Sequence, residues 1–385
     1  MSKLSHSRRG VIVVPALAAV LALSACTPAA EGANSDTLAV VATTTQLADF
    51  ASQIGGDDIS LTSLLQPGAS AHHFDPSPKE LVAMSQADVL IVNGAELEGF
   101  IDSAIEASGF SGELVTASDG IDLAEAKAIT AEGEREAETG ETPEHDHDHD
   151  HADHEAADGA VGEADHDHAD EEAGHEGHDH GDEEAGHDGH DHGDVNPHLW
   201  TSPRYASGMA AEVARGLAHA DPAHAADYTQ RAAELEEQLT TLDEWVSEQF
   251  AGVPAADRVL VSGHDSLRYF LHDYDIAYAG AIMPSFEDNA EPSAAELDAL
   301  SAKIRERGVR AIFVESSMSP KLAQTIARET GITVVDSDAL YADSLGAAGS
   351  GAETYVDATV HNTRVILEAW GVTPGPVPKG LGEHS

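Results

Sequence analysis

Short apolar runs alternate with amphipathic segments along the chain. The run TLAVVA at 37–42 is apolar and rich in β-branched residues, and the segment 44–56 then places apolar side chains at steps of three and four before a glycine pair. The run DVLIV at 88–92 opens a second unit of the same kind. Strands that alternate with helices predict a mostly parallel sheet with covered faces, so we expect an N-terminal α/β lobe over residues 37–220.

A long amphipathic segment follows this lobe. Its apolar positions recur at steps of three and four, the pattern of a helix with one buried face. They are Tyr228, Ala232, Leu235, Leu239, Leu242, Val246 and Phe250. At 1.5 Å per residue the stripe predicts a helix about 40 Å long, so we assign residues 221–252 to a helix that connects two lobes. A coiled-coil dimer segment is the alternative, although the pattern stops at Gly252.

The alternation of strand and helix then resumes. Strands are predicted by three apolar runs, at 258–263, 310–316 and 332–341. A last helix at 354–370 precedes a tail after Gly371 that we expect to be loose. We therefore expect a C-terminal α/β lobe over residues 253–385. The predicted fold class is α/β, with two lobes, each a mostly parallel sheet flanked by helices, joined by one long helix.

Residues 131–194 interrupt the N-terminal lobe. They contain 26 Asp and Glu residues against one basic residue, Arg135, and almost no large apolar side chains. A segment of this composition cannot bury enough apolar surface to fold by itself. We interpret it as a disordered insertion rich in His, Asp and Glu, which a compact lobe tolerates because the cost of closing a loop rises slowly with its length.

The first 26 residues have the pattern of a signal peptide. Basic residues precede the apolar run VIVVPALAAVLAL at 11–23, which is too short to span a membrane. The run ends at LSAC, which resembles the lipobox where cleavage leaves a lipidated cysteine. Cys26 is the only cysteine, so neither a disulfide nor a cysteine-based zinc site is available to it. We predict a lipoprotein signal peptide at 1–26 and a tether at 27–36; an ordinary secretory signal with a chance cysteine is the alternative.

The net charge of the chain and the predicted signal peptide together limit which partners the protein can have. The formal net charge of the chain is -51, which excludes nucleic acid or an anionic lipid surface as the main partner. The leader predicts an extracytoplasmic protein that is anchored to the cell membrane and contacts it through the lipid only. We expect a monomer.

Four stretches each place a metal-capable side chain at the end of a predicted strand or in a loop. In open α/β sheets such loops gather ligands. The stretches are PGASAHHFDPSP around His72, NPHLW around His198, VSGHDSLRYF around His264 and YADSLG around Asp343. Each of these residues, taken alone, is compatible with a surface or hydrogen-bonding role.

These stretches resemble the signature segments of the metal-binding solute-binding proteins of bacterial ABC transporters, the zinc/manganese group called cluster A-I or the adhesion-lipoprotein family. The first, G-x-x-x-H-x-[FY]-[ED]-P, is matched by Gly68, His72, Phe74, Asp75 and Pro76. The second, [ND]-P-H-x-W, is matched by Asn196, Pro197, His198 and Trp200. The third, H-D-[AS]-x-x-Y-F, is matched by His264, Asp265, Ser266, Tyr269 and Phe270. The fourth is the carboxylate before Ser-Leu in Asp343, Ser344 and Leu345.

The resemblance covers about residues 37–370 and implies a specific function. It implies that His72, His198, His264 and Asp343 bind one metal ion between two lobes. It also implies that the protein is not an enzyme and that its partner is an ABC permease. The first segment departs from the family pattern, because Ser70 and Ala71 replace the usual Asp-Pro.

The ligand set indicates which metal to expect. Three imidazoles and one carboxylate suit tetrahedral Zn²⁺, whereas Mn²⁺ prefers more oxygen ligands. In the family, a glutamate at the third position goes with manganese, so His264 favours zinc. A manganese receptor of the same family remains the alternative.

Several neighbouring residues compete for these roles. His73 is the rival of His72, and Asp336 or Asp338 could supply the carboxylate in place of Asp343. Glu315 follows a predicted strand; it either orients a ligand imidazole or is a solvated strand-end residue.

The insertion contains most of the histidines of the chain. We predict that they form several weaker, exchangeable zinc sites, because ordering a disordered segment costs free energy at each binding event. They are His145, His147, His149, His151, His154, His166, His168, His175, His178, His180, His187, His190 and His192.

The expected function is capture of Zn²⁺ outside the cytoplasm and its delivery to an ABC permease. A zinc hydrolase is a second hypothesis, but four protein ligands leave no open position for water, and motifs such as HExxH are absent from the sequence. A surface metal buffer or adhesin that acts through the insertion is a third, and it would not need four spaced ligands.

Overall fold

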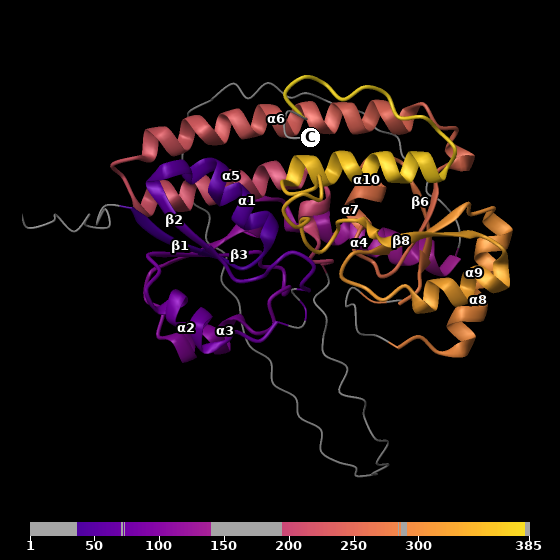
Figure 1. The fold of residues 1–385 in the computed structure, drawn as a ribbon, viewed down its shortest axis with the longest axis horizontal. Helices are drawn as coiled ribbons and strands as arrows, with labels where there is room; N and C mark the ends of the chain where they lie inside the picture. The colour runs from indigo at the N-terminus through magenta and orange to yellow at the C-terminus, as the bar shows by residue number, and fades with distance from the viewer. Residues whose placement is uncertain are drawn as a thin grey trace, which may run out of the picture. The chain divides into compact units, whose positions relative to one another are not determined.

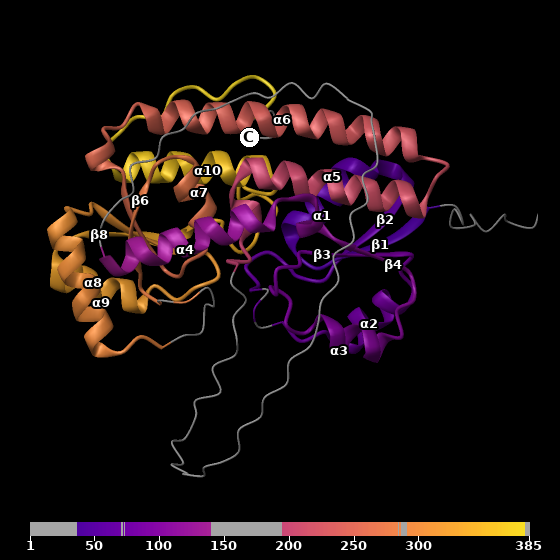
Figure 2. The ribbon, with the colours of Figure 1, turned by 180° about the vertical axis from the view of Figure 1, so that it is seen from behind.

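The computed structural model describes residues 37–70, 72, 74–139, 195–283, 285 and 291–381. The predicted leader, the tether, Cys26, His73 and the histidines of the insertion lie outside the described residues. So do the side chains of residues 137–139 and 336–339. Figure 1 shows the arrangement of the elements, and Figure 2 shows it from behind.

The N-terminal lobe contains a four-stranded parallel sheet in the order β2-β1-β3-β4. Its strands are β1 (Leu38–Ala42), β2 (Ile59–Ser63), β3 (Val89–Val92) and β4 (Glu113–Thr116). The central strand β3 is buried along its whole length, as a strand covered on both faces must be. All four strands point the same way, so their carboxyl ends meet at one edge.

Helices cover both faces of this sheet. They are α1 (Thr45–Gly55), α2 (Pro78–Ser85), α3 (Ile101–Ser108) and α5 (Pro203–Ala220), with the short 3-10 turns η1 (Gly56–Asp58), η2 (Ala117–Gly120) and η3 (Leu199–Thr201). A further helix, α4 (Leu123–Thr139), follows η2 and packs mainly outside this lobe. In both views α2 and α3 lie on the opposite side of the sheet from α1 and α5 (Figures 1 and 2). The start of α2 is fixed by a capping box in which Ser77 and Glu80 satisfy free amides of the first turn.

The C-terminal lobe repeats this plan with the strand order β6-β5-β7-β8, again all parallel. Its strands are β5 (Val259–Ser262), β6 (Ala277–Ala281), β7 (Ala311–Glu315) and β8 (Thr333–Leu340). Its helices are α7 (Arg268–Asp273), α8 (Ala294–Arg307), α9 (Lys321–Thr330) and α10 (Tyr355–Ala369), with the 3-10 turn η4 (Ala255–Asp257). The predicted α/β fold class with two parallel sheets is therefore confirmed.

The long helix α6 (Ala225–Ala251) packs against helices of both lobes. It lies along α1 and α5 of the N-terminal lobe and along α10 of the C-terminal lobe (Figures 1 and 2). Its buried residues include Tyr228, Leu235 and Phe250, members of the stripe that predicts it. One helix therefore joins the backs of two sheets, as the sequence pattern indicates.

The expected start of the insertion at residue 131 is wrong. Helix α4 continues to Thr139, and Figure 2 shows it reaching from the N-terminal lobe to β6. Thr130 bonds the backbone amide of Asn196 at 3.0 Å, and Glu136 accepts the amide of Tyr278 at 3.1 Å. Packing against α7 and β6 therefore stabilises a helix that has few large apolar side chains of its own.

The tail after Gly371 is also not loose over its described part. Trp245 of α6 donates its indole N–H to the carbonyl of Pro376 at 3.0 Å, and Gln249 accepts the amide of Gly375 at 2.7 Å. Leu381 is 2 % exposed. The tail is held by bonds to α6 that its proline- and glycine-rich sequence does not reveal.

Among the helices that the structure describes, none combines the length and apolar character needed to cross a membrane.

Candidate metal centre

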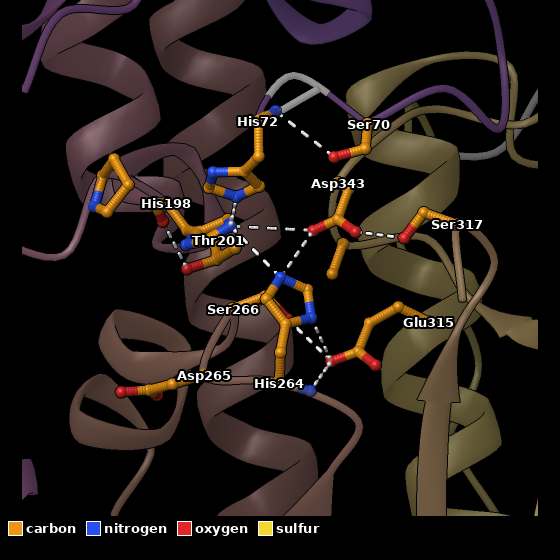
Figure 3. Close-up of polar contacts among 12 residues, drawn as sticks. Ser70, His72, His198, Thr201, His264, Asp265, Ser266, Glu315, Ser317 and Asp343 are labelled. Atoms are coloured by element: carbon orange, nitrogen blue, oxygen red, sulfur yellow. Dashed lines mark hydrogen bonds and ion pairs between the residues drawn. The ribbon is translucent and has the colours of Figure 1, made fainter. Parts of the chain in front are cut away.

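Four side chains meet where strands of both sheets end. His72 lies in the loop between β2 and α2, and His198 lies at the start of η3 just before α5. His264 follows β5, and Asp343 follows β8. Because the strands of each sheet are parallel, their carboxyl ends place His72, His264 and Asp343 at facing edges, and the start of η3 brings His198 to the same point. Figure 3 shows the four side chains pointing toward one another.

The distances between the facing atoms are short. His198 Nε2 lies 3.1 Å from His72 Nε2, 3.4 Å from His264 Nε2 and 3.7 Å from Asp343 Oδ1. His264 Nε2 lies 3.2 Å from the same Asp343 oxygen. Ligand atoms about 2.0–2.1 Å from a tetrahedral zinc ion are separated by about 3.3 Å. The separations around His198, and that between His264 and Asp343, are therefore close to those of a tetrahedral ligand set.

Burial makes this cluster costly unless it binds a cation. His198 and His264 are fully buried, Asp343 is 4 % exposed and His72 is half-buried. Asp343 Oδ1 has no well-aligned hydrogen bond among the described residues, and it lies 3.2 Å from His264 Nε2, so the charge of a protonated His264 is what compensates it in the metal-free site. A buried carboxylate oxygen needs such a charge or a donor to replace its hydration. A divalent ion at the point that the imidazoles face would satisfy it.

The electrostatics of the cluster prepare it for a cation. Burial, with His264 and His72 close by, holds the pKa of His198 well below its usual value, so this imidazole is neutral. Burial also acts to lower the pKa of His264, but the carboxylates of Asp343 and Glu315 outweigh it and raise the pKa well above its usual value. Burial acts to raise the pKa of Asp343, but His264 and His198 hold it well below its usual range.

Glu315, at the end of β7, lies behind His264 and is fully buried. It accepts the amides of Gly263 at 3.0 Å and His264 at 3.3 Å, and Oε1 also lies 3.3 Å from His264 Nδ1. A side chain on Gly263 would meet Glu315 Oε2 at 2.1 Å, so it would displace the Glu315 carboxylate. Of the two roles considered for Glu315, a solvated strand-end position does not fit, and orientation of His264 does.

We expect Glu315→Gln to weaken metal binding by about 10- to 100-fold, the usual loss when a residue behind a ligand histidine is altered. The amide keeps the size of the side chain but removes the charge beside Nδ1 of His264. Metal competition measures the affinity. Glu136→Gln is the control, because it removes another carboxylate, a half-buried one that bonds Tyr278 and Arg307 instead. Equal affinities of Glu315→Gln and the wild type would contradict a positioning role.

The structure brings together the four residues that the motifs single out. Of their rivals, His73 and the side chains of Asp336 and Asp338 lie outside the described residues, so the choice between them and His72 or Asp343 stays a prediction. Among the described residues, one ligand atom each of His72, His198 and His264 lies within 4.8 Å of the other two.

Contacts between the lobes support the site from outside and were not predicted. Trp200 donates its indole N–H to the carbonyl of Ala342 at 2.7 Å, beside Asp343. The amide of Gly68 bonds the Ser344 hydroxyl at 2.7 Å. These residues belong to the four motifs, so the sequence did contain a signal for these contacts. The motif positions that are not ligands hold the segments of the two lobes together.

Two parallel α/β lobes joined by a long helix, with a buried cluster of three imidazoles and a carboxylate between them, define a metal-binding solute-binding protein. Comparison with known proteins agrees: the chain belongs to the family described as zinc-uptake complex component A, periplasmic (ZnuA), whose profile matches residues 40–369. This family is one of solute-binding receptors and not of enzymes. The resemblance seen in the four motifs is thereby confirmed.

Proteins with different metals in their names match most of the chain. The manganese-binding lipoprotein MntA of Bacillus subtilis is 27% identical over 366 residues, which cover 94% of this chain and 99% of the relative. The metal ABC transporter substrate-binding lipoprotein SsaB of Streptococcus sanguinis is 24% identical over 360 residues, 91% of this chain and 96% of the relative. The solved structure of the periplasmic zinc-binding protein TroA of Treponema pallidum has the same fold, with a TM-score of 0.64 at 23% identity, covering 87% of this chain and 99% of that one.

Proposed function

We propose that the protein is an extracytoplasmic, lipid-anchored receptor that captures Zn²⁺ between its two lobes and delivers it to an ABC permease. His72, His198, His264 and Asp343 are the proposed ligands. The observation that carries the proposal is the convergence of three Nε2 atoms and one carboxylate oxygen, with measured separations of 3.1–3.7 Å, in a buried place. Such a cluster has no other evident use in a protein of this family.

Zinc is favoured over manganese by the ligand set. Three imidazole nitrogens and one carboxylate oxygen form the closed, four-coordinate arrangement that zinc adopts, and zinc binds such sites more tightly than manganese. Two of the relatives are named for manganese or for metal in general, so a manganese receptor is the second candidate. The imidazole of His264, fully buried at the third position, is the feature that favours zinc in this proposal.

The domain plan predicted from the sequence forms part of the proposal. Residues 37–220 and 253–385 would act as the two lobes, and 221–252 as the helix that limits their relative motion. Hydrogen bonds join the lobes directly, such as those of Trp200 to Ala342 and of Gly68 to Ser344. They favour release of the ion through modest shifts of the lobes and loops rather than through a wide opening of the lobes. Cys26 is the proposed site of lipid attachment, and residues 140–194 the proposed zinc-collecting segment.

Metal competition on protein lacking residues 140–194 tests the function. Without this segment the protein is expected to bind one equivalent of Zn²⁺, and excess Mn²⁺ is expected not to displace it. The control is the double variant His72→Ala with His264→Ala in the same background, which should lose this site. One tight zinc equivalent in the double variant would overturn the ligand assignment, and preferential retention of Mn²⁺ by the unaltered site would favour the second candidate.

A further inference from the structure

Asn196 is a fully buried residue two positions before His198, and each of its polar groups is bonded. Its amide N–H donates to Thr130 Oγ1 at 3.0 Å, and its carbonyl accepts the Tyr269 hydroxyl at 2.6 Å. Its side-chain NH₂ donates to the carbonyl of Asp265 at 2.6 Å. Its side-chain oxygen lies 3.1 Å from the amide of His198 and 2.8 Å from Nδ1 of the same histidine.

These partners fix the orientation of the Asn196 amide. The Asp265 carbonyl can only accept a hydrogen bond, and the His198 backbone N–H can only donate one. The NH₂ group must therefore face Asp265, and the oxygen must face His198. An oxygen 2.8 Å from Nδ1 requires that Nδ1 carry the hydrogen. In a neutral His198 the lone pair is then on Nε2, the atom that faces His72, His264 and Asp343.

The same amide also connects the lobes. Asp265 directly follows His264 in the chain, so the bond from Asn196 ties the segment of one proposed ligand to the segment of another. Removal of the side chain would leave a buried Asp265 carbonyl without its donor and would free the His198 ring to rotate or to change tautomer. Both changes act on the position of Nε2.

We propose that Asn196 is a positioning residue for metal capture: it holds His198 as the Nδ1–H tautomer with Nε2 directed to the ion, and it couples that ring to the segment of His264. This inference rests on the proposed function. It assigns to the asparagine of the NPHLW stretch a role that its place in a motif does not explain.

The test uses the full-length protein and two measurements. Nitrogen NMR of the metal-free wild type, with His198 identified by its absence in His198→Ala, is expected to show a protonated Nδ1 and an unprotonated Nε2 at neutral pH. Asn196→Ala is expected to lose this signature and to bind zinc about 10- to 100-fold more weakly in competition with a chelator. Asn196→Asp keeps an oxygen beside Nδ1, so it is expected to keep the tautomer and more of the affinity than alanine does.

The control is Asn362→Ala, which removes another buried asparagine, one whose side chain bonds the backbone of Tyr341 at 2.9 and 3.0 Å. It should leave the His198 signature unchanged. A wild-type His198 with its proton on Nε2 overturns the proposal whether or not any variant folds. A zinc affinity of Asn196→Ala within twofold of wild type also overturns the proposal for Asn196. In that case, loss of zinc binding in His198→Ala would still support the proposed function. Unaltered zinc binding in His198→Ala would instead defeat the proposed function.

A separate observation concerns the other oxygen of Asp343. Oδ1 faces the imidazoles, whereas Oδ2 accepts the hydroxyl of Ser317 (Figure 3). Ser317 lies in a turn after β7 that is held by two backbone bonds, from Ser316 to Leu340 at 2.9 Å and from Met318 to Glu315 at 3.0 Å. One carboxylate oxygen is therefore already engaged by a residue whose position is fixed.

We infer that Ser317 is a specificity-determining residue, because it leaves Asp343 only one oxygen for the ion. Zinc accepts four ligands, whereas manganese gains from a second carboxylate oxygen. This inference also rests on the proposed function. Without the hydroxyl, Asp343 is free to offer both oxygens, which helps manganese more than zinc.

Competition between Zn²⁺ and Mn²⁺ on the full-length protein tests this role. Ser317→Ala is expected to lower the ratio of zinc to manganese affinity by about tenfold, and Ser317→Thr, which keeps the hydroxyl, is expected to retain the wild-type ratio. Ser319→Ala, at an exposed position in the same segment, is the control. A ratio in Ser317→Ala within twofold of wild type, with zinc binding still lost in His198→Ala, would overturn this inference and leave the function intact.

Discussion

Replacing His198 with alanine is expected to abolish high-affinity zinc binding. This imidazole is fully buried, and its Nε2 lies within 3.7 Å of the facing atoms of all three other proposed ligands. A structural site with four ligands binds zinc with about 10–16 kcal/mol, so one ligand accounts for roughly 3 kcal/mol. That corresponds to at least about a hundredfold rise in the dissociation constant. Competition with a chelator at less than one equivalent of zinc measures it.

The matched control for this loss is His224→Ala. His224 is a histidine of the same chain, but its side chain is 36% exposed and pairs with Asp221 at 2.6 Å at the start of α6. Its replacement should leave zinc affinity unchanged. If His198→Ala binds zinc as tightly as His224→Ala does, the cluster between the lobes is not the high-affinity site.

Zinc affinity is expected to fall by about tenfold per pH unit as the pH is lowered from 7 to 5. The sign follows from His264, whose pKa is raised well above its usual value by Asp343 and Glu315, so that the metal-free protein holds a proton there. Zinc must displace this proton, and lower pH favours the protonated form. The lowered pKa of Asp343 keeps that carboxylate ionised over the same pH range, so Asp343 does not contribute to the change of zinc affinity with pH.

Calorimetry in buffers of different ionisation enthalpy measures the proton directly. One proton is expected to leave per zinc bound near pH 7, because the lowered pKa of His198 means that this ring has already lost its proton. His264→Ala is the control, since it should remove both the proton release and the tight site. An affinity that does not change between pH 7 and 5.5 would contradict the electrostatic description of the cluster.

The sequence predicts the central strands of each sheet better than the edges. Strands β3, β5 and β7 are fully buried, and their continuous apolar runs are visible in the sequence. Three of the four edge strands, β2, β4 and β6, were not predicted, whereas the edge strand β8 was. β2 alternates half-buried and exposed positions in ISLTS, and β6 has the weak sequence AYAGA. Edge pairing depends on a neighbour far along the chain, which local patterns do not show.

The site is recoverable from the sequence only in part. Strand-end positions and motif order single out His72, His198, His264 and Asp343, but their separations depend on how two sheets face each other. The bonding of Asn196 and the engagement of Asp343 by Ser317 are likewise tertiary contacts between segments far apart in the chain. The start of the insertion was misjudged for the same reason: Glu136 of α4 is held by Tyr278 and Arg307, which composition cannot reveal.

X-ray absorption at the zinc edge tests the central claim most directly, on protein lacking residues 140–194 and loaded with one equivalent of Zn²⁺. The account predicts four ligands at about 2.0–2.1 Å, three of them imidazoles and one oxygen, with one imidazole fewer in His198→Ala. Two or fewer imidazoles in the unaltered site, or an oxygen-rich shell of six, would contradict capture of zinc by His72, His198, His264 and Asp343.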